Sequence, residues 1–413
     1  MQKKLLKSLF KKFKKGGFKV VYWDGEENNY GSEEPKVKIL FRRPLPAGLN
    51  LDDPVMAFGE AYMDEILDFE GNIEEIFRII ELNKENLITE GLGSKMLSAS
   101  LKALGIPKNK LRQKENIQHH YDLGNDFFSL WLDETMSYSC AYFKDTEDSL
   151  FQAQVRKIDH ILKKLELQPG ERLLDIGSGW GWLIIRAAQC FDVGALGITL
   201  SEEQYHAAKK RITELGLTDR VEVKLLDYLD LDENEHHFDK IVSVGMFEHV
   251  GKENLPKYME KVHKLLKPGG VSMLHTIAKS NETPVNSWMQ KYIFPGGYVP
   301  SLREIIYLMP EFDFHLLHAE SLRMHYAMTL AQWYKNFSRH LKEIERKFGR
   351  RFVRMWSLYL QGCKASFRVS GLNVYQLLFS KGINNNLSLT LDHVYREPAQ
   401  VYEKERGIKV MLN

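Results

Sequence analysis

A glycine-rich loop is the part of the sequence with the clearest chemistry. Residues 175–181 read DIGSGWG, after an apolar run and before a helical pattern. Gly177 and Gly179 let the backbone turn sharply and let a ligand lie against it. A dinucleotide fingerprint would read G-x-G-x-x-G, whereas here Asp175 stands just before the glycines. Its carboxylate can pair with an ammonium group. The loop therefore indicates a cofactor without phosphate, such as S-adenosylmethionine, or else an ordinary strand-to-helix turn.

Polar residues also follow the later apolar runs. Glu248 and His275 lie at or just beyond the ends of the fourth and fifth expected strands. In an open α/β sheet, ligands bind beyond the carboxyl ends of the strands. For His275 alone a structural histidine is the alternative, and for Asp227 a turn residue. The residues that follow the second and third runs are Thr199, Leu200, Gln204 and Asp227.

The elements that must position these residues follow a regular order. From residue 116 onward, short apolar runs alternate with helix-length amphipathic segments such as 201–215 and 254–266. Strands that alternate with helices predict a mostly parallel sheet covered on both faces. We therefore expect an α/β fold, a doubly wound Rossmann-like domain, over residues 111–413.

The N-terminal part has a different pattern. The first fifteen residues hold seven lysines and no acid, and their apolar residues recur at helical spacing. We expect residues 1–17 to form a cationic amphipathic helix on an anionic membrane surface. A frayed terminus and a helix docked on its own domain are the alternatives. Two β-type runs and a helical segment predict a small α+β domain over residues 18–110. The apolar residues of the stripe are Leu5, Leu6, Leu9, Phe10 and Phe13.

Composition limits the possible partners. The chain has 413 residues, with 57 Lys and Arg against 55 Asp and Glu, so bulk charge gives no reason to expect nucleic acid. Charged residues interrupt every apolar run before the length that a membrane-spanning helix needs. The three cysteines Cys140, Cys190 and Cys363 form no CxxC pair, which indicates a reducing, cytoplasmic location. No metal is expected, since the His119 segment has no further ligands at suitable spacing.

Several motifs in series resemble one family. In order they are YSCAYF at 138–143, LDIGSGWG, GITLS with Gln204, VGMFEHVG at 244–251, LLKPGG, MLHTI at 273–277 and YIFPGGYVPS at 292–301. Together they resemble the cyclopropane-fatty-acyl-phospholipid synthases over residues 116 to 385. GEAYMD at 59–64 resembles the N-terminal region of the longer, phospholipid-acting bacterial members. Two departures are visible: Ser178 stands where the family usually has Cys, and MLHTI replaces LLHTI.

The resemblance implies a reaction and a set of site residues. Such enzymes transfer methyl from S-adenosylmethionine to a cis double bond of a lipid acyl chain, and proton loss then closes a three-membered ring. The intermediate cation requires a dry site and a base. The resemblance implies a bicarbonate ion as the base, with direct deprotonation by Glu248 as the rival. It implies that the ion is held by Glu248, His275, Tyr326, the Cys140 segment and the Ile277 backbone. It implies that the cofactor contacts Tyr121, Tyr138, Ser139, Gly177, Gly179, Thr199, Leu200 and Gln204.

Partners follow from the same resemblance. They are an unsaturated phospholipid acyl chain and a second copy of the chain in a homodimer. The lysine-rich N-terminal segment adds a bilayer surface with anionic lipids, expected on the inner face of the cell membrane. Residues 286–300 and the helical segments 325–348 and 350–367 would form an acyl-chain tunnel, or a helical cap that buries its own aromatic side chains. The candidate lining residues are Trp288, Phe294, Trp333 and Phe337.

Other functions remain open at this point. Methylation of the same double bond without ring closure needs the same cofactor loop and lipid tunnel. A catalytically silent lipid-binding protein could share the scaffold, although intact Asp175, Glu248 and His275 count against it. A methyltransferase for small molecules with nitrogen or oxygen acceptors is least favoured, because it requires neither the cationic N-terminus nor the long apolar cap.

Overall fold

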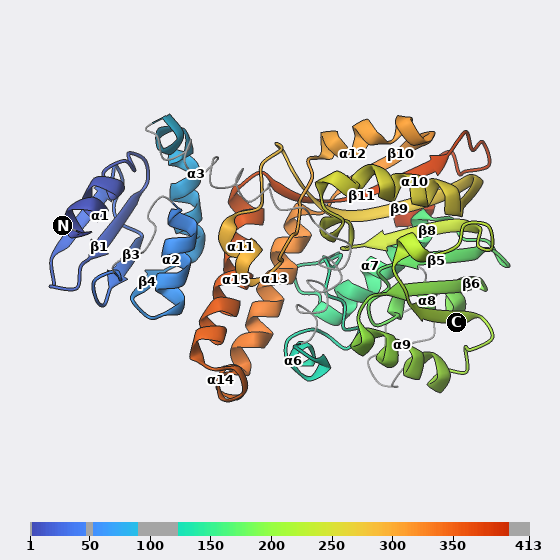
Figure 1. Ribbon diagram of the computed structural model, residues 1–413, viewed down its shortest axis with the longest axis horizontal. Helices are drawn as coiled ribbons and strands as arrows, with labels where there is room; N and C mark the ends of the chain where they lie inside the picture. The colour runs from blue at the N-terminus through green and yellow to red at the C-terminus, as the bar shows by residue number, and fades with distance from the viewer. Residues whose placement is uncertain (1, 47–52, 90–122, 396–413) are drawn as a thin grey trace. The chain divides into compact units, whose positions relative to one another are not determined.

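The computed structural model of the chain describes residues 2–46, 53–89 and 123–395 (Figure 1). They fall into two compact units, which are described separately below. Of the described residues, the first unit takes those between 2 and 89, 283–295 and 330–372, and the second takes 123–282, 296–329 and 373–395. The first unit is therefore assembled from three separate stretches of the sequence.

A seven-stranded sheet forms the centre of the second unit, in the order β10-β11-β9-β8-β5-β6-β7. β5 pairs in parallel with β6 and β8, β6 with β7, and β8 with β9, whereas β10 and β11 are antiparallel. The carboxyl ends of the five parallel strands therefore meet at one edge. The strands are β5 (Arg172–Ile176), β6 (Gly194–Thr199), β7 (Val221–Leu225), β8 (Phe238–Val244), β9 (Leu266–Lys279), β10 (Phe314–Ser321) and β11 (Leu372–Lys381).

Helices cover both faces of this sheet. Leu173 and Val242 pack in one buried cluster with α7, α8 and α9, whereas Leu174 and Ile241 pack in another with α10 and α12. Burial on both faces explains the continuous apolar runs. The predicted doubly wound α/β fold is confirmed. The helices are α6 (Asn125–Ser129), α7 (Leu150–Lys164), α8 (Trp182–Phe191), α9 (Glu202–Glu214), α10 (Leu255–Leu265), α12 (Leu302–Leu308) and α16 (Asp392–Tyr395), with 3-10 turns η1 (Tyr228–Asp230), η2 (Phe247–His249), η3 (Lys252–Asn254) and η4 (Pro310–Phe312).

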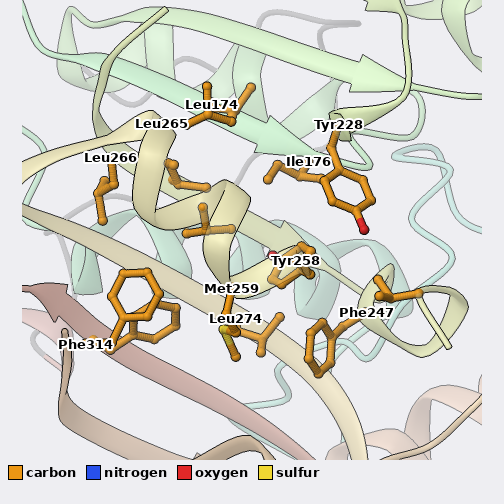
Figure 2. Packing of buried hydrophobic residues seen from close by; sticks show 14 of the residues in the cluster. Leu174, Ile176, Tyr228, Phe247, Tyr258, Met259, Leu265, Leu266, Leu274 and Phe314 are labelled. Carbon is orange, nitrogen blue, oxygen red and sulfur yellow. The ribbon is translucent and has the colours of Figure 1, made fainter. Parts of the chain in front are cut away.

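An aromatic cluster on α10 supports the carboxyl edge of the sheet. Tyr258 is 1% exposed and packs edge-on against Phe247, with ring centroids 4.9 Å apart, and against Tyr228 at 5.5 Å (Figure 2). Phe247 opens the short turn η2 and is fully buried. Because its ring is fixed in this core, the residue that follows it in the turn has a defined position.

The first unit contains a smaller sheet in the order β2-β1-β3-β4. β1 is antiparallel to β2 and parallel to β3, and β3 is antiparallel to β4. The expected small α+β region is therefore present. Helix α13 (Arg323–Arg339) is divided between the two units. The other elements are α1 (Gln2–Phe10), β1 (Gly17–Val21), β2 (Glu27–Gly31), β3 (Val37–Phe41), α2 (Pro54–Met63), β4 (Leu67–Gly71), α3 (Ile73–Thr89), α11 (Ser287–Tyr292), α14 (Leu341–Phe348) and α15 (Arg350–Val369).

The structure corrects the expectation of a membrane-lying N-terminal helix. Leu6 and Phe10 of α1 are buried in the core of the first unit, where the Phe10 ring lies 5.7 Å from the Phe18 ring, centroid to centroid. Lys3 and Lys7 both pair with Glu26. The apolar stripe is used for folding, so it cannot enter a lipid layer without leaving this core. The alternative of a helix docked on its own domain is the one found.

Helix α15 is part of the first unit and lies along α3. A Cβ built on Gly362 would lie 3.3 Å from the Phe77 ring. Lys364 and Arg368 pair with Glu74 at 2.8 and 3.1 Å. A helix from late in the sequence therefore completes the packing of the N-terminal region.

The aromatic residues of the expected tunnel pack within the same unit. Trp288 is buried, donates from Nε1 to the Met63 sulfur at 3.3 Å and fills the space above Gly59. Phe294 packs edge-on against Tyr359 at 5.8 Å between centroids. Trp288 and Phe294 thus fit the alternative of a cap that buries its own aromatic side chains. Within the described ranges, no helix is both long and apolar enough to cross a membrane.

Candidate active site

The glycine loop ends β5 and forms one wall of a cavity. Gly177 and Ser178 donate backbone hydrogen bonds to the Ile198 carbonyl at 3.0 and 2.9 Å, which ties the loop to β6. Gly177 has a φ of 87°, and a Cβ there would lie 2.9 Å from the Met246 side chain. A larger residue would therefore be strained and would displace Met246. The loop brings bare backbone to the cavity wall.

The cavity brings together the predicted cofactor residues that the structure describes. Its wall is made by the 135–139 segment, the glycine loop and the chain that follows β6, β7 and β8. Tyr121 lies outside the described residues. The predicted residues in the wall are Tyr138, Ser139, Asp175, Gly177, Gly179, Thr199, Leu200, Gln204 and Asp227.

Asp175 supplies an unpaired carboxylate oxygen to this wall. Its side chain is 2% exposed, and its Oδ1 has no hydrogen-bond partner. Burial raises the pKa of Asp175 to about 7, and the charge of Lys157 opposes that effect. A buried acceptor without a partner is costly until a donor or a cation binds it. The site therefore fits the ammonium group of S-adenosylmethionine.

The chain beyond β6 is held by side-chain hydrogen bonds. The Thr199 hydroxyl donates to Gln204 Oε1 at 2.8 Å and accepts from the Ser201 backbone at 3.2 Å. Ser201 caps α9. Asp227, after β7, accepts from the Leu229 backbone at 3.0 Å. Asp227 is thus a turn residue and also part of the cavity wall, so its interpretation as a turn residue and its interpretation as a cofactor residue are compatible.

A buried lysine lies between the cavity and the 138–143 segment. Lys157 Nζ donates to Ser139 Oγ at 3.0 Å, and Gln154 donates to the Ser139 carbonyl at 3.0 Å. Burial lowers the pKa of Lys157 to about 8, opposed by the charges of Asp133, Cys140 and Asp175 in that order. Lys157 therefore fixes Ser139, a predicted cofactor residue, from inside the protein.

Cys140 is buried and is not activated as a nucleophile. It is 1% exposed, and its thiol lies 3.8 Å from the Leu322 carbonyl. Burial raises the pKa of the thiol well above its ordinary value, and the thiolate is the reactive form. The backbone N–H of Tyr326, on α13, donates to the same Leu322 carbonyl at 3.1 Å. The predicted residues Cys140 and Tyr326 therefore meet around one carbonyl group.

Glu248 occupies the turn η2 after β8. The Ile277 backbone N–H donates to Glu248 Oε1 at 2.6 Å, whereas Oε2 is buried without a partner. Burial raises the pKa of Glu248 to about 7, and the Ile277 hydrogen bond opposes this. The carboxyl group therefore holds a proton more readily than an exposed glutamate, and its Oε2 has no hydrogen-bond partner.

His275 lies on β9, two residues before Ile277. It pairs with Val244, the last residue of β8, and lies four residues before the end of β9 at Lys279, so it is inside the fifth parallel strand and not at or just beyond its end as the sequence predicted. His275 is 2% exposed; its Nδ1 lies 3.2 Å from Gln376 Nε2, and its Nε2 has no partner. Burial lowers the pKa of His275 well below its ordinary value. The site therefore offers two unpaired buried atoms, Glu248 Oε2 and His275 Nε2.

The sequence analysis did not predict four buried polar residues that hydrogen-bond to predicted site residues or to one another. They are Gln154, Lys157, Lys164 and Gln376. One signal existed for the lysines. Lys157 and Lys164 stand seven residues apart on the same stripe of α7 as the buried Ile161 and Leu150, so they interrupt an apolar face. Gln376 gave no signal, because a glutamine in a strand is compatible with either face. Among the described side chains, no group of His, Cys, Asp and Glu could hold a metal ion.

The comparisons with known proteins agree with this geometry. Residues 108–377 match the family described as mycolic acid cyclopropane synthetase, and residues 5–91 match a domain family of unknown function, DUF7884. A probable fatty acid methyltransferase of Pseudomonas putida is 37% identical over 383 residues, covering 91% of this chain and 95% of the relative. The cyclopropane-fatty-acyl-phospholipid synthase of Escherichia coli is 39% identical over 353 residues, covering 84% and 87%.

Solved structures point the same way. The cyclopropane synthase MmaA2 of Mycobacterium tuberculosis has a TM-score of 0.62 and 35% identity, covering 65% of this chain and 98% of that one. The mycolic acid cyclopropane synthase CmaA1, complexed with SAH and CTAB, has a TM-score of 0.61 and 34% identity over similar shares of 65% and 98%. The resemblance stated from the motifs is therefore confirmed: the chain belongs to the mycolic acid cyclopropane synthetase family of methyltransferases.

Proposed function

We propose that this protein transfers a methylene group from S-adenosylmethionine to the cis double bond of an unsaturated phospholipid acyl chain, forming a cyclopropane ring. The observation that carries the proposal is the pair of unpaired buried atoms on Glu248 and His275, at the same sheet edge as the glycine-loop cavity. Methyl transfer uses the cofactor cavity. The cation that this transfer leaves must then lose a proton, and the unpaired pair supports a dry place for that step.

The reaction makes two demands on the chain. Methyl transfer forms a bond from the methyl carbon to one alkene carbon and breaks the methyl–sulfur bond, which leaves a cation on the other alkene carbon. Loss of a proton from the transferred methyl group then supplies the electron pair that closes the ring. The site must therefore exclude water, which would trap the cation, and must remove one proton. Burial of Glu248, His275 and Cys140 supports the proposal with respect to the first demand.

We propose bicarbonate as the base at the second step, because it fits the unpaired atoms. Bicarbonate has one O–H donor and several acceptor oxygens. His275 Nε2, if protonated, can donate to it, and ionised Glu248 Oε2 can accept from it. When bound, bicarbonate would supply the proton acceptor. Tyr326, the Cys140 segment and the Ile277 backbone complete the proposed set of residues. Direct proton removal by Glu248 is the rival, and its raised pKa of about 7 is compatible with that role.

The cofactor residues have proposed roles as well. Asp175 would bind the ammonium group of S-adenosylmethionine, and Gly177 and Gly179 would leave room for its amino acid part. Ser139 and Tyr138 would close the cavity from the opposite wall. We also propose that Tyr121 forms a lid over the cofactor and that Asp227 lies next to its adenine.

Membrane contact and dimerisation are proposals too. We propose that the protein acts at the inner face of the cell membrane, since its proposed substrate is a membrane lipid. The buried residues Leu6 and Phe10 of α1 do not support this contact, but the exposed residues Lys4 and Leu5 do, and Leu5 is 53% exposed. A homodimer with the 18–110 region in its contact is the expected assembly, which light scattering after size-exclusion chromatography would test.

The experiment for the function is product analysis. The purified full chain is incubated with S-adenosylmethionine and vesicles of monounsaturated phosphatidylglycerol, and the released fatty acids are analysed by mass spectrometry and proton NMR. A gain of one CH2 with upfield cyclopropane protons is expected. The same mass gain with vinylic signals, or a gain of two further hydrogens with methyl-branch signals, would replace ring closure by methylation alone. That second function is favoured by one similar protein, the tuberculostearic acid methyltransferase UfaA1 of Mycobacterium tuberculosis, which is 35% identical over 378 residues.

A further inference from the structure

A row of buried polar side chains leads away from His275 inside the second unit. Gln376 Nε2 lies 3.2 Å from His275 Nδ1, and Gln376 Oε1 accepts from Lys164 Nζ at 2.8 Å. Lys164 also donates to Glu320 Oε2, which lies 2.6 Å from His160 Nε2. Lys164 and Gln376 are both 0% exposed. An ammonium and an amide without solvent need fixed partners, so each contact in the row constrains the next.

Lys164 determines which way the Gln376 amide points. An ammonium group only donates hydrogen bonds, so the atom that faces it must be the amide oxygen. The reverse orientation would place the amide NH2 against the ammonium. Burial lowers the pKa of Lys164, but the charge of Glu320 and its hydrogen bond oppose that shift. Glu320 is ionised, because the His160 hydrogen bond and the Lys164 charge outweigh the effect of burial and leave its pKa at about 2. This ionised partner favours the ammonium form of Lys164. The amide nitrogen of Gln376 therefore faces His275.

The amide nitrogen in turn determines the protonation of His275. An amide NH2 group only donates, so His275 Nδ1 must accept and carries no proton. The ring is neutral, because burial and the charges of Lys157 and Lys164 lower its pKa well below the ordinary value, opposed only in part by Glu320. A neutral imidazole has one N–H. That proton is then on Nε2, the buried ring atom without a partner.

We infer that Gln376, oriented by Lys164, is a positioning residue that fixes His275 as the Nε2–H tautomer, so that His275 donates a hydrogen bond to an oxyanion and is not the base. The identity of that oxyanion rests on the proposed function, whereas the tautomer does not. A donor fixed in advance stabilises an anion without reorganising when the anion binds. The inference gives β11 a role in the site.

The tautomer can be measured directly on the full chain without substrates. The protein is prepared with 15N-labelled histidine, and long-range proton–nitrogen correlation spectra distinguish protonated from unprotonated ring nitrogens. A His275→Gln variant identifies the His275 signals among those of the 14 histidines by their absence. The expected pattern is an unprotonated Nδ1 and a protonated Nε2. A proton on His275 Nδ1 in the unaltered protein would overturn the inference.

The decisive variant is Gln376→Glu. A carboxylate beside Lys164 only accepts, so it should draw a proton onto His275 Nδ1, and ring formation should fall on the order of 100-fold with cofactor affinity unchanged. The matched control is Gln189→Glu, the same change at an exposed position of α8, which should alter neither. If Gln376→Glu does not fold, Gln376→Met removes both hydrogen bonds at similar volume and should give a mixture of tautomers. An unprotonated Nδ1 in folded Gln376→Glu, or a single unchanged tautomer in Gln376→Met, would refute the role of Gln376.

The two proposals fail in different ways. If the unaltered protein shows the expected tautomer but forms no cyclopropane product, the proposed function is wrong and the positioning role of Gln376 is still supported. If it forms the product but His275 carries its proton on Nδ1, the proposed function is supported and the positioning role of Gln376 is wrong.

Discussion

Replacing Glu248 by glutamine should remove ring formation and at the same time stabilise the protein. Burial raises the pKa of Glu248 from 4.5 to about 7, so the folded state holds a proton that the unfolded state has lost between these values. The cost to stability is absent well below pH 4.5 and complete above pH 7. Linkage with 1.36 kcal/mol per pH unit gives a cost of about 3 kcal/mol at pH 8 and below about 1 kcal/mol at pH 5.

The amide introduced by Glu248→Gln would keep an acceptor for the Ile277 N–H and would carry no charge at any pH. This variant should therefore raise the free energy of unfolding by about 3 kcal/mol at pH 8 and by less than about 1 kcal/mol at pH 5. Ring formation should fall by about 100-fold or more, because the free acceptor oxygen becomes a donor. Affinity for S-adenosylmethionine should hardly change, since Glu248 is not in the wall of the glycine-loop cavity.

The assay is urea unfolding of both proteins at pH 5 and pH 8, followed by circular dichroism, with calorimetric titration of the cofactor alongside. The matched control is Glu253→Gln, an exposed glutamate five residues later, which should show no difference between the two pH values. Equal stabilisation by Glu248→Gln at both pH values would refute the argument from burial. Loss of cofactor binding in step with ring formation would place Glu248 in a different part of the site.

Three further predictions concern other parts of the chain. Gly177→Ala should lower the affinity for S-adenosylmethionine at least about tenfold by calorimetry, because Ala is strained at a φ of 87° and its Cβ meets the neighbouring methionine; unchanged affinity would remove the loop from the binding site. Iodoacetamide should label Cys190, which is exposed, and leave buried Cys140 unmodified in the folded protein by mass spectrometry; rapid labelling of Cys140 would contradict its burial. Phe10→Ala should destabilise the protein by about 3 to 5 kcal/mol in urea unfolding, whereas Leu5→Ala, at an exposed position of the same helix, should change stability by less than about 0.5 kcal/mol; equal effects would mean that α1 is not docked.

The parts of the site that depend on local sequence could be predicted. Asp175 and Gly177 stand together in one loop, and their order alone separates this loop from a dinucleotide fingerprint. Glu248 could be placed because it follows β8 at the edge where the parallel strands end. His275 was expected at the end of its strand but lies four residues inside β9, beside the last residue of β8. The α/β fold followed from the alternation of apolar runs and amphipathic segments in the same way.

The parts that depend on distant partners could not be predicted. An amphipathic stripe such as that of α1 shows that an apolar surface must be covered, but lipid and protein cover it equally well. A lysine at position 164 is ordinarily solvated, and its buried role becomes visible only when Gln376, 212 residues away, lies beside it. The orientation of the Gln376 amide depends on its contacts with Lys164 and His275 together, so no single residue of the sequence predicts it.

The first unit is built from stretches that lie far apart in the sequence, and this affects the order in which it can fold. Its N-terminal region packs against α15, which ends at Val369, through Glu74 and Phe77 of α3. During synthesis α3 therefore leaves the ribosome long before α15, and its surface stays without this partner until nearly the whole chain has been made. Contacts of such long sequence separation form late and slowly. We therefore expect the α3 surface of the nascent chain to be a site where a chaperone binds until α15 is available.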